Sequence, residues 1–162
     1  MKKKDAKRIA AMVIAIMDEL NICGSMAFVN TNNVTVYKKL YGNARPMTLA
    51  IAVNKGAESA YTGARTGALA KQIKDGKRTR ELYGIPKKTF VPFHGGCPIY
   101  TKAGVLIGGA GFSEQTGITD ERIIAAAIEN CGFLSDTPVM KDIPHKKILK
   151  AAKKASKNLA KK

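Results

Sequence analysis

Apolar residues recur every three or four positions near the start of the chain, and Ile9, Val13 and Ile16 fall on one helical face. The same spacing and its capping residues predict helices over 4–20, 47–61, 66–74 and 120–130. Short apolar runs between turn residues predict strands over 26–29, 34–37, 90–93, 98–101 and 105–112. The resulting order, α-β-β-α-α-β-β-β-α, is typical of an α+β domain in which helices cover both faces of an antiparallel sheet.

A glycine-rich segment over 90–113 is the most distinctive part of this pattern. Gly95 and Gly96 can adopt positive φ or let the backbone lie close to a flat or anionic ligand. A tight bend is the alternative interpretation of the pair. Pro98, which lacks an N–H donor, suits the start of a strand, and the turn at 102–104 predicts a hairpin after it.

This segment resembles the signature of the GlcG/HbpS-like family, also described as haem-degrading or haem-binding. The residues that match are Gly95-Gly96-Cys97-Pro98-Ile99, the glycine-rich run 105–113 and, upstream, 50–55 (AIAVNK), which is similar to the family's IAxxKAxTA. The resemblance extends over residues 8–134. The family includes the C-terminal domain of some propanediol-utilisation adenosyltransferases. The resemblance implies a three-layer α-β-α fold with a profilin-like sheet, haem or a related tetrapyrrole as ligand, and assembly into a homo-oligomer.

The chain departs from the family at Gly56, where alanine is usual. Glycine costs a helix about 1 kcal/mol relative to alanine. We therefore expect either a break in the helix at this position or a close contact that only glycine permits.

Charge divides the chain into two parts. The net charge of +16 is concentrated in residues 1–8 and 141–162, and the centre is nearly balanced. We therefore expect a domain over 1–134, followed by a linker and a lysine-rich, helix-compatible tail over 135–162. The tail is either solvated or an interfacial helix that contacts a polyanion, such as a nucleic acid, through residues 141–162.

Cysteine usage and the N-terminus bear on the compartment. The three cysteines have no CxxC spacing, which favours reduced thiols and a cytoplasmic protein. Lys2-Lys3-Lys4 and the apolar run 9–17 resemble the start of a signal peptide, so export is the alternative. Asp18 and Glu19 follow without a cleavage site, and the run is too short for a membrane span.

Two residues beside the glycine pair could carry chemistry. His94 could be an axial haem or metal ligand through a ring nitrogen, or a loop residue bonded to nearby backbone. Cys97 could supply a thiolate, or it could be a core side chain, because the family commonly has an aliphatic residue there.

The remaining site candidates are cations. Lys55 matches the lysine of the family's second helix and could pair with a haem propionate or a substrate carboxylate, as could Arg65. Apolar walls are expected from Ile51, Phe93 and Ile107. The cofactor-binding set is therefore Lys55, Arg65, His94, Gly95, Gly96 and Cys97.

Three classes of function follow. The first is a small-ligand-binding protein of the GlcG/HbpS type, with haem as the cofactor. The second is an enzyme or accessory factor acting on a small hydroxy-acid or aldehyde in glycolate- or propanediol-type catabolism, with Lys55, His94 and Cys97 as acid–base or nucleophilic groups. The third is a polyanion binder. No P-loop, HExxH or GxSxG motif occurs, Asp120-Glu121 is explained as helix N-terminal charge, and nothing in the sequence requires an enzyme.

Overall fold

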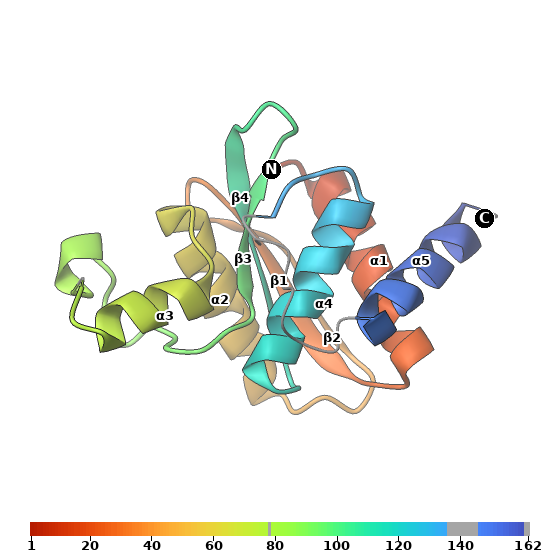
Figure 1. Cartoon of the computed structure of the whole chain (residues 1–162), viewed down its shortest axis with the longest axis horizontal. Coiled ribbons are helices and arrows are strands. Elements are labelled where there is room, and N and C mark those ends of the chain that lie inside the picture. The colour runs from red at the N-terminus through yellow and green to blue at the C-terminus, as the bar shows by residue number, and fades with distance from the viewer. Residues whose placement is uncertain (78, 136–145, 161–162) are drawn as a thin grey trace.

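The computed structural model describes residues 1–77, 79–135 and 146–160, and these form three layers (Figure 1). A four-stranded antiparallel sheet lies in the middle, with α2 and α3 on one face and α1, α4 and α5 on the other. The expected α+β, α-β-α architecture is confirmed. The elements are α1 (Lys3–Leu20), β1 (Gly24–Asn30), β2 (Thr35–Tyr41), α2 (Met47–Thr62), α3 (Thr66–Lys74), a 3-10 turn (Glu81–Tyr83), β3 (Gly96–Tyr100), β4 (Leu106–Ser113), α4 (Gly117–Asn130) and α5 (Lys146–Leu159).

The strands have the order β2-β1-β4-β3, and every neighbouring pair is antiparallel. The hairpin expected from the glycine-rich segment is present as β3 and β4. The strand predicted over 90–93 is wrong. Its polar backbone groups bind side chains instead: the Val91 N–H donates to Glu58, and the Phe93 carbonyl accepts from Thr66.

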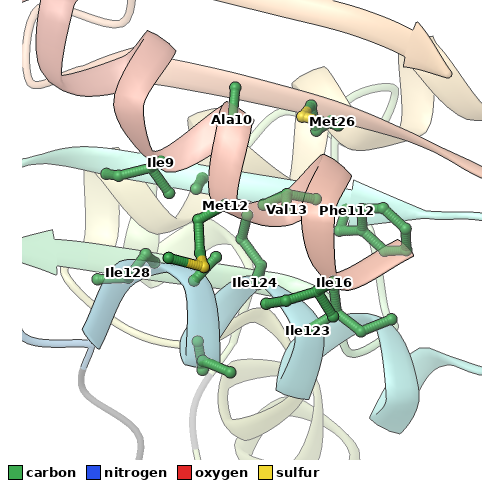
Figure 2. Close-up of a cluster of buried hydrophobic side chains, with 14 of the residues drawn as sticks. Ile9, Ala10, Met12, Val13, Ile16, Met26, Phe112, Ile123, Ile124 and Ile128 are labelled. Carbon is green, nitrogen blue, oxygen red and sulfur yellow. The ribbon is translucent and has the colours of Figure 1, made fainter. Parts of the chain in front are cut away.

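Aliphatic and aromatic side chains fill the core between the sheet and the helices on its α1 face. Figure 2 shows α1 and α4 contributing opposed rows of these side chains, with β1 and β4 closing the cluster. Complete burial of each such side chain contributes roughly 1.5–3 kcal/mol. The fully buried members include Ile9, Val13, Ile16, Met26, Phe112, Ile123, Ile124 and Ile128.

On the opposite face of the sheet, glycines of β4 allow the backbone of α2 to contact the backbone of the sheet. A Cβ on Gly111 would lie 2.0 Å from the Ala52 carbonyl oxygen, and one on Gly109 would lie 2.4 Å from the Gly56 carbonyl oxygen. A Cβ on Gly56 itself would meet the Gly111 nitrogen at 3.2 Å. The helix α2 therefore continues through Gly56. The close contact between α2 and β4 explains why glycine stands here where the family usually has alanine.

The lysine-rich tail forms α5, which packs against α1 and α4 (Figure 1). Ile148, Ala152 and Ala155 are buried in the main core, and Lys154 pairs with Glu19 at 2.6 Å. The expectation of a solvated tail is therefore wrong for this helix, although its lysines remain exposed. The expected linker lies largely outside the described residues. In the described part of the chain, no helix is both long and apolar enough to cross a membrane.

Packing of α5 can be tested on two neighbouring residues. Ile148→Ala is expected to lower the free energy of unfolding by about 2 kcal/mol, because Ile148 is 6% exposed. Leu149→Ala should cost far less, because Leu149 is 49% exposed. Urea unfolding of both variants measures the difference, and equal midpoints would mean that α5 does not pack on α1.

Candidate functional site

A cavity of about 490 Å³ lies where α2 passes the end of β4 and the start of α4. Its wall is mostly apolar, and Phe93 is 61% exposed beside it. The cavity is lined by Ile51, Lys55, Pro92, Phe93, His94, Ser113, Gln115, Thr116, Gly117 and Asp120.

One wall contains a buried ion pair. The Lys55 Nζ donates to the Asp120 Oδ2 at 3.0 Å and to the Phe112 carbonyl at 2.9 Å, and both charged side chains are almost fully buried. Asp120 Oδ1 accepts the Gln115 N–H at 2.9 Å. Burial raises the pKa of Asp120 to about 6, although the Lys55 ammonium acts in the opposite direction. The pair ties α2 to β4 and α4, so the ammonium of Lys55 is already committed.

A second charged group fixes the imidazole at the cavity. The buried Glu121 carboxyl accepts from Arg65 Nη1 at 2.8 Å, and its other oxygen lies 3.1 Å from His94 Nδ1. Burial would raise the pKa of Glu121, but the His94 hydrogen bond and the Arg65 charge outweigh it, so this pKa lies below its ordinary value. In a neutral imidazole, an ionised Glu121 favours the tautomer with the proton on Nδ1, in which Nε2 carries the lone pair.

The glycines around His94 make room for protein atoms. A Cβ on Gly95, whose φ is +120°, would lie 2.5 Å from Lys55 Nζ, and one on Gly96 would lie 2.5 Å from Thr66 Cγ2. A Cβ on Gly67 would lie 2.0 Å from His94 Nδ1. Gly95 and Gly96 were expected to admit a ligand, but in the structure the space beside them is filled by protein atoms. Gly67 is a further glycine on which the position of the His94 imidazole depends.

The structure brings only part of the expected set to the cavity. Lys55 and His94 line it, whereas Arg65 does not and is linked to His94 only through Glu121. Cys97 is fully buried in the core cluster, as its core interpretation requires, and does not line the cavity. Ile107 also packs against the core and is absent from the wall.

Sequence reasoning missed the roles of Asp120 and Glu121. The helix begins at Gly117 with Thr116 as its N-cap, three residues before the predicted start at 120. Asp120 lies in the first turn of α4, as the helix N-terminal interpretation expects. That interpretation is incomplete, because Asp120 and Glu121 are also buried partners of Lys55, Arg65 and His94. The available signal was helical spacing, because Asp120 and Glu121 lie four positions before the apolar Ile124 and Ala125 and therefore share a helix face with them.

The described residues contain no group of three or more His, Cys, Asp and Glu side chains that could hold a metal ion. A ligand that brings its own metal and needs one imidazole remains compatible with His94.

Comparison with known proteins identifies the family and the fold. The model of a family described as "Haem degrading protein HbpS-like" matches residues 1–129. The crystal structure of a PduOC–haem complex superposes with a TM-score of 0.71 at 19% identity and covers 80% of this chain and 93% of that one. The crystal structure of Klebsiella pneumoniae ORFY superposes with a TM-score of 0.73 at 21% sequence identity, and the match covers 81% of this chain and 89% of that one. The structure of a double mutant of Streptomyces reticuli HbpS has a TM-score of 0.70 at 23% sequence identity, and the match covers 80% of this chain and 85% of that one. At these identities the structures establish a shared fold. No curated protein sequence matches the chain.

Proposed function

The chain belongs to the HbpS-like family of haem-degrading proteins, and on that premise we propose that the cavity beside His94 binds haem or a related tetrapyrrole. A protein of the same fold has been solved as a haem complex. The cavity volume of about 490 Å³ lies within the roughly 300–1,000 Å³ typical of small-molecule and cofactor sites.

The observation that carries the proposal is the His94–Glu121 contact at 3.1 Å. A carboxylate on Nδ1 orients an imidazole and raises the basicity of Nε2, which is the usual second contact of a metal-binding histidine. Bound haem would supply an iron that takes an axial imidazole. The donor set and the apolar wall of Ile51, Pro92 and Phe93 therefore fit a tetrapyrrole.

The cations expected for the haem propionates do not fit that role. Lys55 is paired with Asp120, and Arg65 is paired with Glu121. We assign both as positioning residues: Lys55 fixes the wall of the cavity, and Arg65 keeps Glu121 ionised and directed at His94. Assembly into a homo-oligomer stays a prediction from the resemblance.

A haemin titration followed by absorbance tests the proposal. The wild type is expected to give a saturable Soret band, and His94→Ala is expected to shift the band and weaken binding at least about tenfold. Cys97→Ala is the matched control and should leave the band unchanged, because Cys97 is buried away from the cavity. Absence of a saturable band would exclude haem binding. An unaltered band in His94→Ala would mean that a residue other than His94 ligates the haem iron.

A second candidate function has support from the same contact. An imidazole oriented by a buried carboxylate is also the arrangement of a general base, which fits proton abstraction from a small hydroxy-acid or aldehyde. Exchange of the α-hydrogens of glycolaldehyde in D₂O, followed by NMR and abolished by His94→Ala, would support this class. Polyanion binding through the exposed lysines of α5 stays a prediction, which the salt dependence of binding would test.

A further inference from the structure

A second cavity, of about 430 Å³, lies between α2, the β1–β2 turn and the loop before β3. It shares no lining residue with the cavity at His94. Its wall combines apolar side chains with hydroxyl and amide groups. The lining residues are Asn33, Thr35, Val53, Asn54, Ala57, Glu58, Tyr61, Gly84, Ile85, Pro86 and Thr89.

Glu58 gives this cavity its chemistry. Its side chain lies within the fold, with only 4% of the residue exposed. One carboxyl oxygen, Oε2, accepts the Val91 N–H at 3.0 Å. The other, Oε1, has no hydrogen-bond partner in the described part of the chain. Because buried polar atoms almost always have a hydrogen-bond partner, this oxygen lacks a donor, and the Glu58 side chain or a neighbour must move before a ligand in the cavity can supply one.

The charges around Glu58 determine which ligand fits. Glu58 is the only carboxyl group among the lining residues, and no lysine or arginine stands among them. Lys55, one turn earlier on α2, is committed to Asp120. Lys87 and Lys88 belong to the facing loop but do not line the cavity. Burial raises the pKa of Glu58 to about 7, partly offset by the Val91 N–H, so this carboxyl titrates near neutral pH without a cationic partner.

We propose that this cavity binds a small organic ammonium, in which a primary amine donates to Glu58 Oε1 and a short alkyl body packs against Val53, Ile85 and Pro86. An anionic ligand would find no counter-charge here. A neutral ligand of the same shape would gain the apolar contacts but no ion pair. The Tyr61 ring is a further favourable neighbour for a cation.

Three probes of equal length test this assignment: n-butylammonium, butan-1-ol and butyrate. Each is titrated into ¹⁵N-labelled protein, and the shifts of the Asn33, Asn54 and Thr89 amide signals are followed. The wild type is expected to bind n-butylammonium at least about tenfold more tightly than butan-1-ol and to show no binding of butyrate. Glu58→Gln should bind the amine and the alcohol alike. Glu81→Gln, which removes a carboxylate outside the cavity, is the matched control and should keep the preference.

The wild type alone gives a second readout. Butylammonium keeps its charge between pH 6 and 8, whereas Glu58 ionises in this range because its folded pKa lies near 7. Affinity for the amine should therefore rise with pH, and affinity for butan-1-ol should not. Equal affinities for the amine and the alcohol, no shifts at the lining amides, a flat pH profile or an unchanged preference in Glu58→Gln would each overturn the proposal. If Glu58→Gln does not fold, the probe comparison and pH profile of the wild type decide.

Discussion

Lys55→Met is expected to lower the free energy of unfolding by about 3 kcal/mol or more at pH 8, and by much less at pH 5. The substitution leaves the Asp120 carboxylate buried without its cation. The pKa of Asp120 is already raised to about 6 in the presence of Lys55, and it rises further without it. Because the unfolded carboxyl titrates near 4, the folded variant holds an extra proton above that pH. Stability therefore falls as pH rises through the folded pKa. Urea unfolding at the two pH values measures this difference.

Two further variants isolate the buried pair. Lys71→Met removes the exposed Lys71–Asp75 pair of α3 and should change stability by less than about 0.5 kcal/mol at either pH. Asp120→Asn added to Lys55→Met should recover much of the loss at pH 8, because the buried group can no longer ionise. A loss in Lys55→Met that is the same at both pH values, or that the second substitution does not reduce, would contradict the ion-pair account.

Gly111→Ala is expected to cost at least about 3 kcal/mol, since a single methyl group would separate α2 from the sheet. The new Cβ would lie 2.0 Å from the Ala52 carbonyl oxygen and 2.7 Å from the Gly56 nitrogen, and both neighbours are backbone atoms. A side chain could rotate away from such a contact, but two backbone segments cannot. The helix must shift, and the walls of both cavities shift with it.

Gly104→Ala is the matched control in the neighbouring turn. Gly104 has a φ of +78° with no atom within 4 Å of a built Cβ, so alanine there meets only the left-handed backbone penalty, about 1–2 kcal/mol. If urea unfolding gives the two variants the same loss, the α2–β4 contact is looser than the structure describes.

The parts of the fold that were predictable rest on local patterns. The apolar period of α1 and the glycine-bounded hairpin of β3 and β4 contain their own signals, and the family resemblance places them in order. The strand expected over 90–93 failed because Glu58 and Thr66, from two other elements, bind its backbone. The burial of α5 was not predicted for a similar reason. Its apolar stripe is narrow, and the tail sequence alone does not show the surface of α1 and α4 on which it packs.

The candidate site was predictable to the same extent. His94 and Lys55 were identified because an imidazole and a lysine lie beside a recognisable glycine motif, and both line the cavity. Their partners Asp120 and Glu121 lie 65 and 27 positions further along the chain, at the start of a helix where acids are ordinary. Only the fold brings the four residues together, and it also shows that Lys55 is paired and not available to a ligand.

A crystal structure of the haemin-loaded protein tests the central claim most directly. The account predicts haem density in the cavity lined by Ile51, Phe93 and His94, with His94 Nε2 as the protein ligand of the iron and the Glu121 contact to Nδ1 retained. Haem density at another surface, or iron held by a residue other than His94, would contradict it.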